Sequence, residues 1–191
     1  MIRGIVFDCF GVLYEGSLAT ITRMCPPEKR DELRDINKQS DYGFIDTNQY
    51  IAGIAELFGQ SYSQIEQLLR EKHQRNTELV DYVRELRAEE KYHIALLSNV
   101  SSGTVEHLFG DELHELFDTV VLSYQEQLLK PNPAVFTLTA TRMRLTPGEC
   151  VMIDDLAENC EGAEIAGMQS IQHIANDTTR YKLTKILLQN A

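Results

Sequence analysis

Short apolar segments recur along the chain and predict the strands of a buried sheet. Five of them have strand character, at residues 4–7, 94–97, 119–122, 150–153 and 170–173. Several are continuous apolar runs, which suit strands that are buried on both faces of a parallel sheet. The stretches between them repeat with a helical period, as in βαβ units. The pattern therefore predicts an α/β fold with a doubly wound, mostly parallel sheet.

A long stretch after the first strand has a different pattern. Strand-like segments disappear there, and amphipathic helical patterns take over, for example at residues 49–58 and 63–74. Ser63 and Glu66 have the spacing of a capping box, which predicts that a helix starts at Ser63. This part of the chain is therefore expected to be all helical.

The helical stretch divides the chain into two parts. We expect a core formed by residues 1–14 and 80–191, with residues 15–79 as a helical insertion. The insertion interrupts the first crossover of the sheet, so it would lie over the carboxyl edge, where open α/β sheets bind ligands. That position suits a lid over a binding site.

Length and charge narrow the functional classes. A chain of 191 residues can form one α/β domain with a small inserted module, but not two full domains. The net charge is -11, from 18 Lys and Arg against 29 Asp and Glu, and no dense basic run occurs. This balance argues against a nucleic-acid partner. A small phosphorylated substrate stays compatible, because a bound metal ion can reverse the charge locally.

No segment indicates a membrane or a disulfide framework. No apolar run approaches the length of about 20 residues that spans a bilayer, and no cleavable signal pattern precedes the first strand. We therefore expect a cytoplasmic protein without a membrane partner. The four cysteines lack disulfide or zinc spacing, and Cys9 is expected to pack rather than to react. The sequence leaves the oligomeric state open.

Polar residues follow the predicted strands where each strand ends. They are Asp8 after the first, Ser98-Asn99 after the second, Lys130 on the loop after the third, and Asp154-Asp155 after the fourth. The carboxyl ends of parallel strands meet at one edge of a sheet, so these groups should converge. Carboxylates grouped in this way are unfavourable unless they bind a cation. The sequence therefore predicts a site at this edge.

The residue types at this edge indicate phosphoryl chemistry. Three neighbouring carboxylates favour a hard divalent cation, most simply Mg²⁺, which prefers oxygen ligands and often adds a substrate phosphate. Lys130 can pair with a carboxylate and a phosphoryl oxygen, and Ser98 can donate a hydrogen bond to another. A carboxylate nucleophile beside the metal could accept the phosphoryl group covalently.

Four segments in this order resemble the haloacid dehalogenase (HAD) superfamily. They run from Ile5 to Leu13, from Leu96 to Asn99, from Lys130 to Pro133 and from Ile153 to Asn159, and they cover essentially the whole chain. The resemblance implies a hydrolase with a HAD-like Rossmannoid core. The helical insertion resembles a C1 cap, and the closest resemblance is to the α-D-glucose-1-phosphatase-like members.

The resemblance also implies a role for each residue of the site. Asp8 would be the nucleophile, Ser98 would bind phosphate, and Lys130 would stabilise the aspartyl-phosphate; Ser98, Asn99 and Lys130 together would bind the substrate. The metal would be held by Asp8, Asp155, the backbone carbonyl of Phe10, and Asp154 either as a ligand or directly behind one.

Phe10 departs from the pattern of the family's phosphatases. Most of them have a second aspartate there, which serves as general acid and base, and phenylalanine cannot transfer a proton. General acid-base catalysis contributes about 10²- to 10⁴-fold. Its loss predicts slow turnover, a substitute proton donor from the cap, or a substrate with an easier leaving group.

The preferred function is a Mg²⁺-dependent phosphatase that acts on a small phosphorylated metabolite, such as a sugar phosphate. One alternative is a dehalogenase, because haloacid dehalogenases carry an aromatic residue at the position of Phe10. The pair Asp154-Asp155 favours the phosphatase, since dehalogenases need no metal and replace part of this pair. The other alternative is a non-catalytic binding protein, because Phe10 replaces the usual acid. The substrate itself is not identified.

Overall fold

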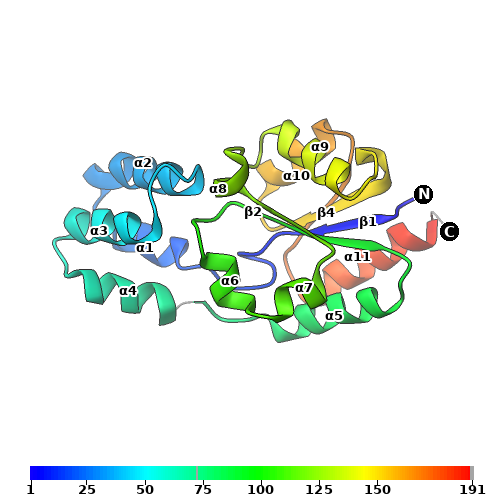
Figure 1. The fold of residues 1–191 in the computed structure, drawn as a ribbon, viewed down its shortest axis with the longest axis horizontal. Helices are drawn as coiled ribbons and strands as arrows, with labels where there is room; N and C mark the ends of the chain where they lie inside the picture. The colour runs from blue at the N-terminus through cyan, green and yellow to red at the C-terminus, as the bar shows by residue number, and fades with distance from the viewer. Residues whose placement is uncertain (72, 190–191) are drawn as a thin grey trace.

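A computed structural model describes residues 1–71 and 73–189 and contains a five-stranded, wholly parallel sheet. The strands are β1 (Gly4–Phe7), β2 (His93–Ser98), β3 (Thr119–Leu122), β4 (Cys150–Asp154) and β5 (Gln169–Gln172). Their order in the sheet is β3-β2-β1-β4-β5, so the chain winds outward from the centre in both directions (Figure 1). The predicted α/β, doubly wound fold is confirmed.

The strands lie where the apolar runs placed them. β1 and β3 match their predicted bounds, β2 is longer by one residue at each end, and β5 is shifted by one residue. β4 continues through Asp154, so that Ser98 and Asp154 are both the last residues of their strands. The polar groups after each strand therefore start from the same edge of the sheet.

Helices cover both faces of the sheet (Figure 1). On one face lie α5 (Thr77–Ala88), α6 (Thr104–Phe109), α7 (Glu112–Leu116) and α11 (Asn176–Gln189). On the other lie α9 (Pro133–Arg142) and α10 (Ala157–Ile165), while α8 (Ser123–Glu126) directly follows β3 and the 3-10 turn Pro147–Glu149 leads into β4.

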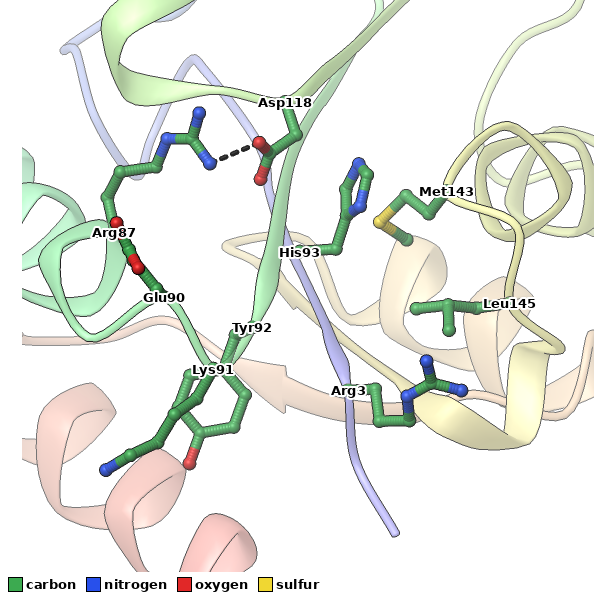
Figure 2. Close-up of a pocket in the computed structure, with 9 residues that line it drawn as sticks. All are labelled: Arg3, Arg87, Glu90, Lys91, Tyr92, His93, Asp118, Met143 and Leu145. Atoms are coloured by element: carbon green, nitrogen blue, oxygen red, sulfur yellow. Dashed lines mark hydrogen bonds and ion pairs between the residues drawn. The ribbon is translucent and has the colours of Figure 1, made fainter.

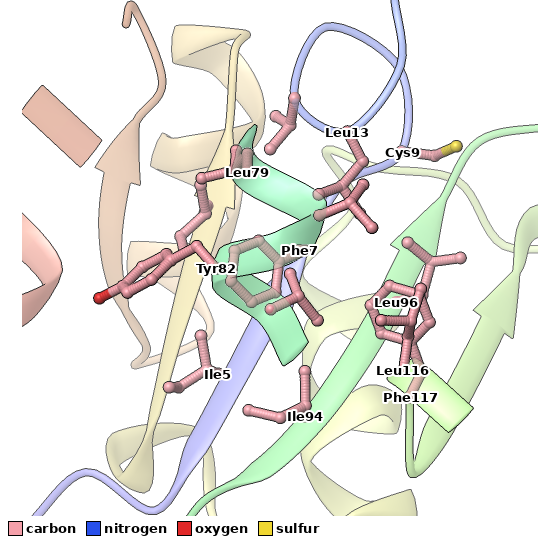
Figure 3. Packing of buried hydrophobic residues seen from close by; sticks show 14 of the residues in the cluster. Ile5, Phe7, Cys9, Leu13, Leu79, Tyr82, Ile94, Leu96, Leu116 and Phe117 are labelled. Atoms are coloured by element: carbon pink, nitrogen blue, oxygen red, sulfur yellow. The ribbon is translucent and has the colours of Figure 1, made fainter. Parts of the chain in front are cut away.

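Alternate residues along the central strands belong to two different hydrophobic clusters, one on each face of the sheet. Ile5 and Phe7 pack on the side of α5, with Leu79 and Tyr82 (Figure 3), whereas Val6 packs on the side of α9. All three strand residues are fully buried. Each such side chain stabilises the fold by about 1.5–3 kcal/mol relative to exposure. Burial of both faces explains why the strand reads as a continuous apolar run.

The stretch between β1 and α5 contains helices and has a hydrophobic cluster of its own. It comprises α1 (Leu18–Met24), a 3-10 turn (Pro27–Lys29), α2 (Arg30–Asp41), α3 (Thr47–Phe58) and α4 (Tyr62–Glu71). The predicted start of the last helix at Ser63 is wrong by one residue. Ser61 exchanges hydrogen bonds with Gln64 and caps α4 instead of the predicted pair. Among the described residues, no helix is both long and apolar enough to cross a membrane.

Two of the contacts between the helical stretch and the core place it relative to the sheet. Its two ends form a short antiparallel ladder, in which the Glu15 amide donates to Gln74 at 2.7 Å and the Asn76 amide donates to Leu13 at 2.9 Å. At its other contact, the Thr47 hydroxyl donates to the Ser102 carbonyl at 2.7 Å. Ser102 lies on the loop that follows β2, so this second contact is at the carboxyl edge of the sheet.

Candidate active site

Asp8 lies directly after β1, at the centre of the sheet. Its amide donates to the Ile153 carbonyl at 2.9 Å, which continues the ladder between β1 and β4 and fixes the backbone. The residue is only 6% exposed. Its Oδ1 accepts a hydrogen bond from the Cys9 amide at 2.6 Å and lies 2.8 Å from Lys130 Nζ. Both contacts fall on the same carboxylate oxygen.

Lys130 joins two of the predicted acids. Its ammonium lies 2.8 Å from Asp8 Oδ1 and 2.6 Å from Asp154 Oδ2, and all three side chains are buried. Burial by itself would lower the pKa of Lys130, but the charges of Asp8 and Asp154 raise it overall. The lysine therefore stays protonated, and it holds the carboxylates of two different strands.

The Asp154 carboxylate is fully engaged by protein donors. Oδ2 accepts from Lys130, and Oδ1 accepts from the Leu156 amide at 3.0 Å and from Asn159 Nδ2 at 2.9 Å. The residue is completely buried. Asp154 therefore contributes negative charge and orients Lys130, with little free lone-pair capacity left on the carboxylate.

Asp155 is half-buried beside the same cluster. Burial, followed by the charge of Asp154, raises the pKa of Asp155. Its carboxylate packs on the backbone of Gly11, where a Cβ would overlap the carboxylate atoms. Gly11 also has a φ of +82°, a conformation that glycine adopts without strain. The turn after β1 therefore needs glycine at this position for two reasons.

The three acids together fit a hard divalent cation. Asp8, Asp154 and Asp155 each offer an oxygen, and these oxygens lie within 4.8 Å of one another. Burial raises the pKa of Asp8 to about 7; Lys130 opposes this effect and Asp154 adds to it. One lysine thus faces three acids, which leaves an excess of negative charge that a divalent cation would neutralise. An all-oxygen donor set of this kind suits Mg²⁺.

The hydroxyl of Ser98 is buried without a hydrogen-bond partner. The residue is 1% exposed, and no described residue lies within hydrogen-bonding distance of Ser98 Oγ. An unsatisfied buried polar group of this kind is unfavourable by about 1–3 kcal/mol. A ligand oxygen at this point would satisfy the hydroxyl, as predicted for a phosphate.

Asn99 is tied to the backbone of Lys130. Asn99 Nδ2 donates to the Lys130 carbonyl, and the Lys130 amide donates to Asn99 Oδ1, both at 2.9 Å. The side-chain amide therefore positions Lys130 and fixes the loop after β3 against the loop after β2. Binding of substrate by Asn99 itself stays a prediction.

Two positioning residues were missed by the sequence reasoning. Asn159 was part of the fourth motif but had no role, and in the structure it donates to Asp154. Ser123 follows β3 just as Asp8 follows β1, and this strand-end position was the signal that could have identified it. Its hydroxyl accepts from the Val100 amide at 2.9 Å and holds the loop after Ser98.

Cys9 and Phe10 follow Asp8 directly, and neither side chain releases a proton at ordinary pH. The ring of Phe10 lies 5.1 Å from that of His73, centroid to centroid. On its other contact, a Cβ added at Gly16 would lie 3.4 Å from the Phe10 side chain. Phe10 therefore packs where the two ends of the helical stretch meet the core. Burial, followed by the charge of Asp8, raises the pKa of the Cys9 thiol, which therefore stays protonated and inert.

A cavity of about 450 Å³ lies at the opposite, amino edge of the sheet (Figure 2). Both of its arginines are paired: Arg87 forms an ion pair with Asp118, and Arg3 pairs with Glu149 at 3.1 Å. Asp118 also accepts from the Ile94 amide at 2.9 Å. This cavity holds structural ion pairs and none of the groups that the sequence marked for chemistry.

Comparisons with known proteins show the family. Residues 2–167 match the family model of the haloacid dehalogenase-like hydrolases. Acyl-CoA dehydrogenase family member 10 of Mus musculus is 35% identical over 71 residues, 37% of this chain and 7% of that protein. Glyceraldehyde 3-phosphate phosphatase of Methanopyrus kandleri is 33% identical over 79 residues, 41% of this chain and 34% of that protein. The chain thus matches well under half the length of these relatives.

A solved structure shares the fold over nearly the whole chain. It is a HAD family enzyme from Bacteroides thetaiotaomicron in complex with magnesium and inorganic phosphate, with a TM-score of 0.75 and 24% identity. The match covers 92% of this chain and 96% of that one. A likeness at this level of identity shows the fold alone.

Proposed function

Because the chain belongs to the haloacid dehalogenase-like hydrolases, we propose that it removes phosphate from a small phosphorylated metabolite, with Asp8 as nucleophile and Mg²⁺ as cofactor. The observation that carries this proposal is the pairing of Lys130 with Asp8 at 2.8 Å and with Asp154 at 2.6 Å, beside Asp155. Two similar proteins support the same chemistry. One is the glyceraldehyde 3-phosphate phosphatase, and the other is the HAD family enzyme in complex with magnesium and inorganic phosphate.

The proposed metal ligands are Asp8, Asp155 and the backbone carbonyl of Phe10. Asp154 stands behind them, because three protein donors already engage its carboxylate. When bound, Mg²⁺ supplies positive charge that draws in the phosphoryl oxygens and stabilises them as their charge develops. The buried excess of acids over lysine is what makes a divalent cation favourable here.

The first step is a transfer of the phosphoryl group to Asp8. Its Oδ1 is held by the Cys9 amide and by Lys130, so Oδ2 attacks phosphorus and the bond to the leaving oxygen breaks. Ser98 donates its otherwise unpartnered hydroxyl to a phosphoryl oxygen. Lys130 compensates the negative charge of the aspartyl-phosphate, and Asn99 keeps Lys130 in place.

The second step is hydrolysis of the aspartyl-phosphate. Water attacks phosphorus, the bond to Asp8 breaks, and the carboxylate is restored for another cycle.

Residues 15–79 form a C1-type cap on the core of residues 1–14 and 80–191, and they limit the access of bulk water at the carboxyl edge. This cap also selects the substrate, because its helices offer side chains to the leaving group.

A dehalogenase fits these charges less well. A haloacid carries its own carboxylate, which the excess of Asp8, Asp154 and Asp155 would repel in the absence of a metal. The same excess of acids favours a phosphate ester that arrives with a divalent cation. The phosphatase is therefore the function that the geometry supports best.

The test is phosphate release from a panel of small phosphate esters, with Mg²⁺ and with a chelator. The wild type should release phosphate only with Mg²⁺, and Asp8→Asn, which keeps the shape but removes the nucleophile, should release none. A matched control is Asp118→Asn, which changes an acid at the amino edge. Undiminished phosphate release by Asp8→Asn would refute the mechanism. If the wild type released no phosphate from any ester, the function would be refuted.

A further inference from the structure

One acid of the helical stretch, Asp41, has no role in any of the sequence motifs. Asp41 is the last residue of α2, and the turn after it packs tightly on the core. At Gly43 an added Cβ would lie 2.7 Å from the Tyr124 carbonyl on α8, and the Thr47 hydroxyl bonds the Ser102 carbonyl. These contacts hold the end of α2 between α8 and the loop that follows Ser98.

The Asp41 carboxylate interacts electrostatically with Lys130. Burial raises the pKa of Asp41 to about 6, and the charge of Lys130 acts in the opposite direction. Lys130 is the same group that lies 2.8 Å from Asp8. Among the described residues, neither a hydrogen bond nor an ion pair engages the Asp41 carboxylate. Asp41 is therefore an acid without a described partner at the docked end of α2, and it interacts electrostatically with the lysine that pairs with Asp8.

The other groups around Asp41 are accounted for. From α3, the Tyr50 hydroxyl donates to Asn37 Oδ1 at 2.9 Å, and burial followed by the charge of Asp41 raises the pKa of Tyr50. Tyr50 therefore stays neutral near pH 7. From α8, the Tyr124 hydroxyl donates to Glu106 and the Glu126 carboxylate pairs with Arg142. Lys130 is thus the charged group of the core that acts on Asp41.

We propose that Asp41 is the proton donor and acceptor that Phe10 cannot be. This role rests on the proposed phosphatase function. In the first step, Asp8 forms a bond to phosphorus, the bond to the leaving oxygen breaks, and the Asp41 carboxylic acid gives its proton to that oxygen. In the second step, the Asp41 carboxylate takes a proton from the attacking water, and the bond between phosphorus and Asp8 breaks. Both protons and both bonds balance over the cycle.

His73 is a titratable group beside Phe10, and it suits the role less well. Its ring lies 5.1 Å from that of Phe10, centroid to centroid, at an interplanar angle of 35°. Burial, followed by the charge of His107, lowers the pKa of His73. The imidazole is therefore neutral near pH 7 and is a poor proton donor. An acid that keeps its proton to higher pH than usual is the better donor.

The test compares Asp41→Asn with Asp35→Asn, which makes the same change on the exposed face of α2. Each variant is assayed with a nitrophenyl phosphate, whose leaving group needs no proton, and with an alkyl phosphate, whose leaving group does. For Asp41→Asn, turnover of the alkyl ester should fall by about 10²-fold or more. The nitrophenyl ester should give a burst of about one equivalent, then slow turnover, because the aspartyl-phosphate lacks its base.

The outcomes separate this role from the proposed function. If the wild type releases phosphate and Asp8→Asn does not, but Asp41→Asn shows equal losses on both esters and no burst, the role of Asp41 is refuted and the phosphatase stands. A wild type that hydrolyses neither ester refutes both. Thermal unfolding of Asp41→Asn and Asp35→Asn should be similar, and a folded Asp41→Asn with wild-type rates would also refute the role.

Discussion

The two edges of the sheet use charge in opposite ways. At the amino edge, each arginine meets an acid at a partly exposed position, as with Arg87 and Asp118 (Figure 2). At the carboxyl edge, one buried lysine faces three acids, and a buried serine has no hydrogen-bond partner among the described residues. Ion pairs with balanced charge need no further counter-ion. A buried cluster with excess negative charge is favourable only when a ligand neutralises it. The imbalance, rather than the volume of a cavity, marks the site.

The strongest test of this contrast is to remove one cation from each edge. Lys130→Met would leave two buried acids without their partner, and we expect the free energy of unfolding to fall by about 3–5 kcal/mol. Arg87→Met breaks a partly exposed pair and should cost about 0–1 kcal/mol. Denaturant unfolding of both variants measures the difference. Equal losses would show that the two edges are electrostatically alike.

Glycines give the next largest contrast. Gly11→Ala introduces a Cβ at positive φ against the Asp155 carboxylate, whereas Gly103→Ala, also at positive φ, meets nothing within 4 Å. Both should cost about 1–2 kcal/mol of strain in the left-handed region. Gly11→Ala should lose more stability than Gly103→Ala and should also bind Mg²⁺ about 10- to 100-fold more weakly, because Asp155 is displaced. Calorimetric titration with Mg²⁺ measures this, and equal affinities would contradict the assignment of Asp155.

The excess of acids also predicts how stability depends on pH and metal. Burial raises the pKa of Asp8 to about 7 and that of Asp41 to about 6, well above their ordinary values. Between about pH 4 and pH 7 the folded state then binds more protons than the unfolded state, so in a chelator the stability should fall as the pH rises.

Mg²⁺ should restore the stability that this rise in pH removes. At pH 7.5, a concentration ten times the dissociation constant should stabilise the fold by about 1.4 kcal/mol. Asp8→Asn should weaken both the pH dependence and the effect of Mg²⁺, while Asp118→Asn at the amino edge should leave both in place. Thermal unfolding across this pH range measures the effect, and stability that rises with pH in the chelator would contradict the excess of charge.

Two buried serines give the smallest and sharpest contrast. Ser98→Ala removes a buried hydroxyl that no described residue engages, so stability should not fall, whereas phosphate affinity should. Ser123→Ala removes the partner of the Val100 amide and should cost about 1–3 kcal/mol. A large loss of stability in Ser98→Ala would mean that its hydroxyl serves the fold rather than a ligand.

The sequence by itself determined the sheet and the edge at which the polar groups meet. The three central strands, β1, β2 and β4, are buried on both faces and are therefore almost entirely apolar, so their bounds could be predicted to within one residue. Parallel strands all end at one edge, so Asp8, Ser98 and Asp154 had to converge there. The predicted HAD-family membership, which rested on the order of these same residues, is confirmed.

Only the tertiary structure decided which contacts each polar group at that edge makes. Asp154 and Asp155 are neighbours in sequence, yet three donors from separate segments engage the first and a glycine backbone packs on the second. Asp41 ends α2, and no strand or motif points to it. The turn at Gly43 after it docks on α8, and the charge of Lys130 acts on its carboxylate. Periodicity encodes which face of an element is buried, whereas contacts between distant segments depend on how the elements pack.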